Sequence, residues 1–505
     1  MTAAADNSRY PLRIGDADEF ARARDFLQQA GFDTAALCGA LGIARISDVD
    51  KVAWDAIKLP DLPARLHWAI ALFVRGAAAT IAGSREICGE ETLAALMALG
   101  LLRPAKRDPS LLVSPIWLYP ADDLILVSDR RDDPEGEPFA PFDDVVFPAI
   151  YDGTLRFLQM LPDVGGGEAL DLCGGCGVGA LHLARSAKHA VTADVTARSA
   201  FFAQFNAALN GAAIESLCGD LYAPVQGRQF DVISAHPPFV PTFGKSMVFR
   251  DGGDTGEEIT RRTIEGLPTH LRPGGTCVIV CTARDTEDGK FHQRARAWLG
   301  QAGAEFDVVL GIEKTRSVEE IVEGLRTRLV AESGEDAPQG LIERLREAGT
   351  QRFVHGALFL RRCEGPIATP PLSVRATPAA AAVDFVGLLA WRQRSRHPNF
   401  QEWLARSRPA LAPKLELTTR QVVRNGRLEP ADQVFSVESA FETALRPDAF
   451  VIPAVRRFDG RRSVADVFHG ARKAGEFPDG FPLEAFSDLV RLMVEQGLLT
   501  VDVAD

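Results

Sequence analysis

Several common sequence signals are missing here, and each absence excludes a class of protein. No run of 18 or more apolar residues occurs among the 505 residues, so we expect no membrane-spanning helix. The N-terminus lacks the basic start and apolar core of a secretory signal, and we therefore expect a cytoplasmic protein. The net charge of −12 disfavours a phosphate-binding surface spread over the whole protein, because such a surface depends on Lys and Arg.

The cysteines give no sign of a metal site. There are eight, and they are scattered, which fits reduced thiols. Cys173 and Cys176 have the CxxC spacing, but neither a second pair nor two histidines at ligand spacing follows them. Because both also lie inside a glycine-rich segment with another predicted role, we expect no bound metal.

Two proline-rich segments without periodicity divide the chain. They cover residues 130–144 and 366–383 and are predicted to be linkers. The length allows about three domains, and the apolar content of 46% is that of a globular protein. We therefore predict domains at 1–140, 145–365 and 384–505.

The two flanking domains are predicted to be mostly helical. In the first, Phe20, Ala23, Phe26 and Leu27 recur at helical spacing, and further helical patterns precede two β-rich segments. In the last, two amphipathic patterns precede a short strand. Both arrangements resemble winged-helix modules, and the second is similar to the PqqD-like type found on peptide-modifying enzymes. The Arg-rich stretch 391–414 is interpreted as a solvated helix and linker.

The central domain carries the pattern of an α/β fold. Strand-like and helix-like segments alternate from about 145 to 365, which predicts a parallel sheet with crossover helices. Within it, "GEALDLCGGCGVGALHL" (167–183) reads as a buried strand, a glycine-rich turn and the start of a helix. Such a unit brings backbone amides and a helix N-terminus close to a ligand.

Two acidic residues indicate the kind of ligand. Asp171 precedes the glycines, where it would repel a pyrophosphate, so a ligand with a cationic group is favoured over a dinucleotide. Asp194 ends the next strand and can accept hydrogen bonds from both hydroxyls of a ribose. S-adenosylmethionine (SAM) fits both acids, since it has a cationic amino group and sulfonium for Asp171 and a ribose for Asp194, but no phosphate.

At this point the sequence resembles the class I SAM-dependent methyltransferases. The acid and glycines of "DLCGGCGVGAL" look like their first motif, Asp194 like the acid of the second strand, and "LCGDLYAPV" like the segment that contacts adenine. The resemblance implies a Rossmann-like sheet and SAM as the cofactor. It also implies that the cofactor-binding residues are Asp171, Cys173, Gly174 and Gly177 at the methionine part, Asp194 at the ribose, and Asp220 with Leu221 at the adenine.

A second motif, "SAHPPF" (234–239), follows the next predicted strand. Two consecutive prolines cannot continue a sheet, so the strand ends here in a stiff loop. The loop resembles the (N/D/S)PP(Y/F) motif of amino-methyltransferases that act on adenine, on guanine N2 of ribosomal RNA, or on release-factor glutamine. The resemblance implies that His236 and a carbonyl fixed by Pro237 accept hydrogen bonds from the acceptor NH2, while Phe239 stacks on the acceptor.

The segment from Phe249 to Gly275 extends this likeness. It resembles the "GG-x-x-G … R … I … L-x-P-G-G" run of the HemK-type glutamine methyltransferases. Tyr222, Arg250 and Asp251 are further candidates for lining the acceptor site.

His236 departs from the family pattern, which has Asn at this position. A neutral imidazole could accept one N–H hydrogen bond, or it could act as a general base.

Three hypotheses about the function of the chain follow. The chain could N-methylate a protein or peptide, or methylate O or N of a small molecule with His236 as base. It could also be a binding protein that kept the SAM fold and lost catalysis. A nucleic-acid acceptor is less favoured because of the negative charge.

Overall fold

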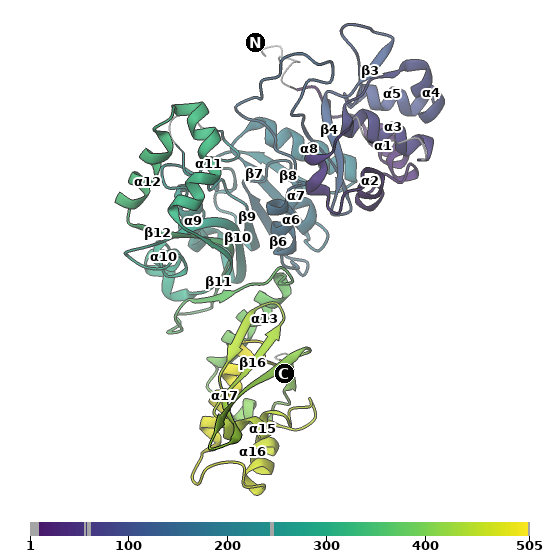
Figure 1. The fold of residues 1–505 in the computed structure, drawn as a ribbon. Helices are drawn as coiled ribbons and strands as arrows, with labels where there is room; N and C mark the ends of the chain where they lie inside the picture. The colour runs from purple at the N-terminus through teal and green to yellow at the C-terminus, as the bar shows by residue number, and fades with distance from the viewer. Residues whose placement is uncertain (1–9, 55–56, 58–61, 243–246, 503–505) are drawn as a thin grey trace. The chain divides into compact units, whose positions relative to one another are not determined.

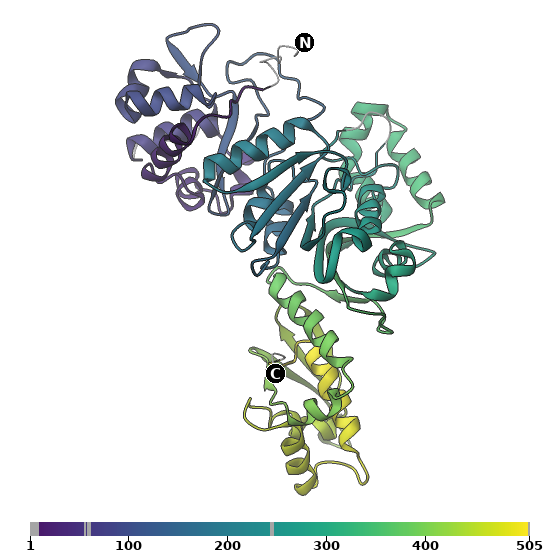
Figure 2. The same ribbon diagram turned by 180° about the vertical axis from the view of Figure 1, so that it is seen from behind.

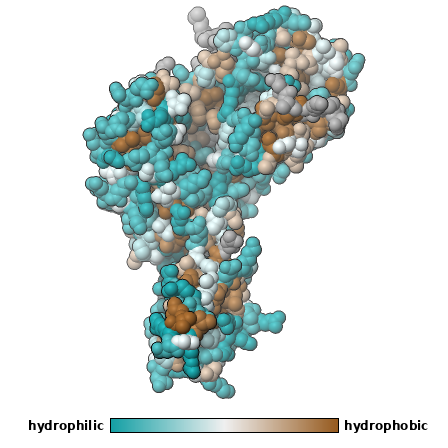
Figure 3. Space-filling model, viewed as in Figure 1, coloured by the Kyte–Doolittle hydropathy of each residue, from teal (hydrophilic) through white to brown (hydrophobic). Residues whose placement is uncertain are grey.

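A computed structural model describes residues 10–54, 57, 62–242 and 247–502 (Figure 1). The chain forms two compact units. The first contains the residues up to 306 with 316–353 and 362–367, and the second contains 307–315, 354–361 and the residues from 368 onward. None of the described helices is long and apolar enough to cross a membrane. Most of the face seen in Figure 3 is hydrophilic.

An eight-stranded sheet has the strand order β13-β11-β12-β10-β9-β6-β7-β8. Its strands are β6 (Glu168–Leu172), β7 (His189–Asp194), β8 (Ile214–Cys218), β9 (Phe230–Ala235), β10 (Leu271–Thr286), β11 (Phe306–Arg316), β12 (Thr350–Arg362) and β13 (Leu372–Arg375). The neighbours from β8 to β10 all pair in parallel, which confirms the predicted α/β class. Chain order reverses between β6 and β9, and open α/β sheets bind ligands at the carboxyl ends of strands at such a point.

Helices connect and cover these strands (Figures 1 and 2). The helices α7 (Val178–Leu183) and α8 (Ala197–Asn210) pack against β6, β7 and β8, while α9 (Glu258–His270) and α10 (Phe291–Trp298) pack against β10. The remaining helices of this region are α6 (Asp152–Gln159), α11 (Val318–Ser333) and α12 (Ala337–Glu347). The helix α8 begins where the Thr196 hydroxyl accepts from the Ser199 N–H, and it ends at Gly211 with φ +65°.

The N-terminal part of the first unit combines helices with small antiparallel sheets. Its helices are α1 (Ala17–Gln29), α2 (Thr34–Leu41), α3 (Ala64–Ala69), α4 (Ile81–Cys88) and α5 (Glu90–Ala98), and its three-stranded sheet contains β1 (Ala79–Thr80), β3 (Leu111–Val113) and β2 (Arg103–Pro104). Phe20, Ala23, Phe26 and Leu27 are buried on α1, as their spacing predicts. The winged-helix interpretation of this part and the three domain boundaries stay predictions.

A β-hairpin follows these elements and leads toward the central sheet. It pairs β4 (Ile116–Ala121) with β5 (Leu124–Asp129) through a two-residue turn. Asp122 and Asp123 in the turn have φ +47° and +60°, the left-handed conformation that tight hairpins require.

The second unit has its own hydrophobic core. It contains α13 (Ala382–Ser395), α14 (Phe400–Arg406), β14 (Ala410–Leu411), β15 (Leu415–Arg424), β16 (Arg427–Glu438), β17 (Glu442–Leu445), α15 (Ile452–Val455), α16 (Val464–Lys473), α17 (Leu483–Glu495) and β18 (Leu499–Thr500). The helices α16 and α17 and the strand β18 lie in the segments where the sequence predicts them. The three-stranded meander β15-β16-β17 is not among the predicted elements.

One prediction about the second unit is correct only in part. Residues 391–414 include exposed positions, but they are not a solvated helix and linker throughout, because Trp391 belongs to the core and the Arg392 side chain is buried. Arg392 forms an ion pair with the buried carboxylate of Asp307 at 2.8 Å, and Arg396 pairs with the same carboxylate at 2.5 Å. The buried acid supplies the charge that lets these arginines leave solvent.

Candidate functional site

The carboxyl ends of β6, β7 and β9 meet at a cavity of about 680 Å³ in the first unit. Nine of the ten residues named from the sequence line it, namely Asp171, Cys173, Gly174, Asp194, Asp220, Leu221, His236, Pro237 and Phe239. The tenth, Gly177, instead packs against α8. It has φ +85°, and a Cβ there would lie 2.7 Å from the Cβ of Ala203. Gly177 therefore serves the packing of the loop and does not line the cavity.

The glycine loop leaves its main chain open to a ligand. A Cβ on Gly174 would lie 1.8 Å from the Thr192 Oγ1, so only glycine fits between the loop and β7. Gly175 lines the cavity with φ +54°, and nothing lies within 4 Å of the position a Cβ would occupy. Its N–H donates to the Asp194 Oδ2 at 3.0 Å. The loop is thus an open cradle fixed to the acid of the next strand.

Asp171 is a buried acid beneath this cradle. Burial raises the pKa of its carboxyl to about 7, although hydrogen bonds from the Ser234 hydroxyl (2.6 Å) and the Ala180 N–H act in the opposite direction. A Cβ on Gly179 would lie 2.5 Å from its Oδ2, so α7 approaches the carboxylate closely. A cationic ligand would stabilise the ionised form of such an acid.

Asp194 and Asp220 line the part of the cavity where the sequence predicts the ribose and the adenine. Asp194 accepts from the N–H groups of Gly175 and Thr196, each at 3.0 Å, which fixes its carboxylate at the edge of the cavity. Asp220 forms an ion pair of 2.6 Å with Arg262 on α9, and both side chains are about half exposed. Arg262 also lines the cavity. Arg262 is not among the predicted site residues, although it lies in the HemK-like run.

The loop after β9 is arranged as the sequence predicts, with the strand ending at Ala235. The His236 ring lies between two aromatic rings, at 5.4 Å and 19° from Phe157 and at 5.9 Å and 38° from Phe239. Phe157 belongs to α6 and is not among the predicted site residues. These contacts limit how far the imidazole can rotate.

The glycines of the HemK-like run support this loop directly. The Val240 N–H donates to the Arg250 carbonyl, and the Gly252 N–H donates to the Val240 carbonyl at 2.9 Å. A Cβ on Gly252 would lie 2.6 Å from the Pro238 carbonyl oxygen, and one on Gly256 would lie 2.5 Å from that of Phe239. Both glycines are therefore needed for the close approach of the two segments.

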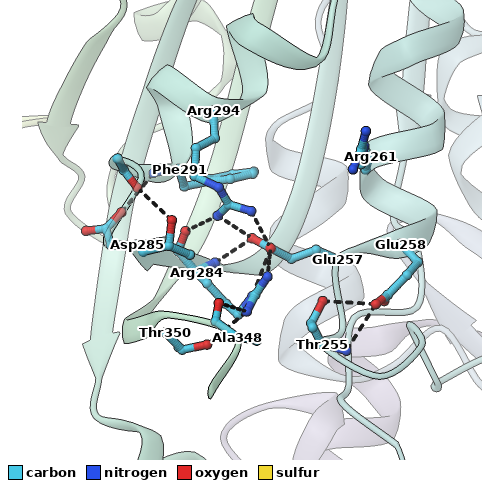
Figure 4. A network of polar contacts seen from close by, with 12 residues as sticks. Thr255, Glu257, Glu258, Arg261, Arg284, Asp285, Phe291, Arg294, Ala348 and Thr350 are labelled. Carbon is cyan, nitrogen blue, oxygen red and sulfur yellow. Dashed lines mark hydrogen bonds and ion pairs between the residues drawn. The ribbon is translucent and has the colours of Figure 1, made fainter. Parts of the chain in front are cut away.

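A buried network fixes Glu257 within this run (Figure 4). Glu257 is 3% exposed and binds Arg284 of β10 at 2.8 Å and Arg294 of α10 at 2.7 Å. Arg284 also donates to the Thr350 hydroxyl at 2.9 Å. Since Glu257 directly follows Gly256, the network anchors the segment that supports the HPPF loop.

The three further candidates for the acceptor site, Tyr222, Arg250 and Asp251, do not all line the cavity. Arg250 and Asp251 line the cavity and pair with each other at 2.6 Å. Tyr222 does not belong with them, since its ring stacks on His270 at 4.4 Å and its hydroxyl donates to the Thr263 carbonyl. Phe147 and Phe249 are not among the predicted site residues, but both line the cavity and their rings stack at 4.6 Å.

The residues of the cavity fit SAM. The two acids suit its cationic groups and its ribose hydroxyls, and the Gly174–Gly175 cradle admits a ligand against the main chain. When bound, SAM supplies an electrophilic methyl group. Over the described ranges of the chain, no group of three or more His, Cys, Asp and Glu is placed to hold a metal ion.

Comparisons with known proteins agree with this fit. The family described as "Methyltransferase small domain" matches residues 148–293. A Methanocaldococcus jannaschii protein named "putative protein N5-glutamine methyltransferase" is 32% identical over 145 residues, which cover 26% of this chain and 72% of that protein.

Two further relatives are matched over less of their length. The ribosomal protein uL3 glutamine methyltransferase of Bradyrhizobium diazoefficiens is 27% identical, over 34% of this chain and 62% of the relative. The ribosomal RNA small subunit methyltransferase C of Alcanivorax borkumensis is 33% identical, over 23% of this chain and 32% of the relative. The chain thus spans less than two thirds of these two relatives.

Proposed function

The chain belongs to the class I SAM-dependent methyltransferases, and from this premise we propose that it N-methylates a protein or peptide acceptor held by the HPPF loop. One observation carries the proposal. A single cavity joins the acids and glycines of the cofactor region to His236, Pro237 and Phe239. A methyl donor and an acceptor nitrogen could therefore meet without either leaving the pocket.

The loop offers what an amide or amino acceptor needs. An amide nitrogen is a weak nucleophile because its lone pair is delocalised into the carbonyl. Hydrogen bonds from its N–H groups to His236 and to the Pro237 carbonyl would return electron density to nitrogen and fix its direction of approach. Alignment of the reacting atoms at ~3–3.5 Å is then the main requirement. The stacking of His236 on Phe157 holds the imidazole ready for this role.

The relatives favour a macromolecular acceptor. By name, two act on protein glutamine and one on ribosomal RNA. We place a protein acceptor first, because the net charge of −12 opposes a general affinity for RNA. None of these names supports the small-molecule hypothesis.

Radiolabelled SAM tests the proposal directly. Purified protein would be incubated with labelled SAM and a cell extract, and the products separated into protein, nucleic-acid and small-molecule fractions. We expect label in the protein fraction, on the nitrogen of a side-chain amide. Label only in RNA or only in small molecules would contradict the proposed acceptor. Binding of SAM without any label would favour a protein that has lost catalysis.

A further inference from the structure

One side of the cavity is built by a segment without regular structure. Residues 144–151, here called the pocket wall, connect the β4–β5 hairpin region to α6, and six of them line the cavity: Asp144, Val145, Phe147, Pro148, Ala149 and Tyr151. A segment with neither helix nor strand depends on outside partners for its backbone hydrogen bonds. The partners of the pocket wall come from the N-terminal part of the chain.

Tyr119 and Asp129 of the hairpin hold the main chain of the wall. The Tyr119 hydroxyl, in the protein interior, accepts a hydrogen bond from the Ala149 N–H at 2.8 Å. The Asp129 Oδ2 accepts from the Val146 N–H at 2.7 Å, and the Asp129 N–H donates to the Val146 carbonyl at 3.1 Å. The positions of two wall residues are thus set by the two strands of the hairpin.

Asp129 also joins the wall to α8. Its carboxylate forms a buried ion pair with the fully buried Arg198, near the start of that helix. The Arg198 guanidinium lies 4.6 Å from the centre of the Phe142 ring, just before the wall. Two residues earlier, the Thr196 N–H donates to Asp194. Through Asp129 and the first residues of α8, the wall is therefore connected to Asp194, the acid predicted to bind the ribose.

A second connection reaches the glycine loop. The fully buried Asn206 of α8 accepts from the Val127 N–H at 2.8 Å and donates to the Val127 carbonyl at 3.1 Å and the Cys176 carbonyl at 2.9 Å. Asn210, one turn later, makes the corresponding pair of bonds with Ile125, and its other bond goes to the Asn206 carbonyl. Only Asn206 of the two links β5 to the glycine loop.

We propose that the β4–β5 hairpin positions the SAM end of the cavity, with Tyr119, Asp129 and Asn206 as its positioning residues. The hairpin binds the wall directly, and Asn206 of α8 joins it to the glycine loop. This gives the N-terminal part a task in cofactor binding, whatever acceptor the protein recognises. The inference rests on the proposed function only for the identity of SAM.

The first test compares two variants that each remove one buried hydrogen-bond acceptor from the N-terminal part. Tyr119→Phe leaves the Ala149 N–H unpaired beside the cavity, and we expect SAM binding measured by calorimetry to weaken about tenfold. Ser84→Ala leaves the buried Trp68 Nε1–H unpaired, far along the chain from the wall. We expect it to lower Tm similarly and to leave the Kd for SAM unchanged.

The second test uses the two asparagines of α8. Asn206→Ala loses bonds to both β5 and the glycine loop, whereas Asn210→Ala loses its two bonds to β5. We expect a weaker Kd, and a raised KM for SAM at nearly constant kcat, only for Asn206→Ala. Unchanged Kd in Tyr119→Phe, or equal weakening in both controls, would overturn the inference. If Asn206→Ala does not fold, Tyr119→Phe decides alone.

These outcomes are distinct from a failure of the proposed function. A wild-type protein that does not bind SAM would contradict the cofactor itself. A wild-type protein that binds SAM but methylates nothing would contradict the proposed activity, and the Kd values of the variants would still test the hairpin.

Discussion

His236 lines the cavity, and two substitutions separate the two roles proposed for it. Asn at this position keeps a hydrogen-bond acceptor but cannot serve as a base, whereas Ala supplies neither. We expect His236→Asn to retain methylation within about tenfold and His236→Ala to lose about a hundredfold in kcat. Equal losses in both variants would instead indicate general-base chemistry and a different acceptor.

The raised pKa of Asp171 leads us to expect that SAM binding depends on pH. Its pKa is raised to about 7, so the carboxyl becomes neutral as the pH falls below 7 and its attraction for a cationic ligand is lost. We expect the Kd for SAM to increase as the pH is lowered from 7.5 to 5.5, by up to about tenfold per unit. Asp171→Asn should bind weakly with a flat profile over this range, and a wild-type profile that is equally flat would contradict the assignment.

The same raised pKa has a consequence for the stability of the ligand-free protein. An acid with a folded-state pKa above its unfolded value binds protons more tightly when folded, so its contribution to stability falls as the pH rises from about 4 to 7. We expect Asp171→Asn to raise the Tm of the ligand-free protein at pH 8 and to have little effect near pH 4. Thermal unfolding at both pH values measures this.

The segment that ends at Glu257 supports the HPPF loop. Its anchoring can be tested by substituting Glu257 and comparing the result with a substitution in a similar buried network elsewhere in the chain. Glu257→Gln leaves Arg284 and Arg294 without a buried charge, which costs about 3 kcal/mol of stability. We expect kcat to fall about tenfold as the support of the loop loosens, with a nearly unchanged Kd for SAM.

Asp307 in the second unit is the control for this variant. It is likewise a buried carboxylate between two arginines, Arg392 and Arg396, but it lies outside the cavity lining. Asp307→Asn should lower the free energy of unfolding by a similar amount and leave kcat of the folded protein unchanged. A similar loss of kcat in both variants would mean that the Glu257 network acts only through stability.

Local spacing explains which elements could be predicted. The glycine loop, Asp194 and the HPPF loop each occupy consecutive or nearly consecutive positions, so the sequence alone predicts both the strand ends and the residues beside them. The meander β15-β16-β17 also carried a signal, because the turn Asn425-Gly426 lies between strands and both residues have positive φ.

Other features are decided by contacts between distant parts of the chain. Phe157 faces His236 across 79 positions only because α6 packs beside the end of β9, and Asn206 meets Val127 across a similar separation. Arg392 and Asp307 are 85 positions apart, so the sequence near Arg392 does not show the buried acid that pairs with it. No short pattern predicts these contacts, since the partner of each side chain is fixed by tertiary packing.

Charge is distributed unevenly along the molecule. Residues 368–505 contain 18 Lys and Arg against 17 Asp and Glu, so the negative charge of the protein resides in the residues before them. These include the whole cavity lining. We expect basic acceptor proteins to be labelled preferentially, with kcat/KM falling several-fold between 50 and 500 mM salt as screening weakens their attraction. Preferential labelling of acidic proteins would contradict this expectation.

The two asparagines on α8 have a further effect on the strand they bind. Ile125 and Val127 both point their N–H and carbonyl groups away from β4, as the free edge of a two-stranded hairpin does, and Asn210 and Asn206 satisfy these groups. An unsatisfied edge of this kind can pair with a strand of another molecule and begin aggregation. Both asparagines therefore also keep β5 from pairing with a strand of a neighbouring molecule while the protein is folded.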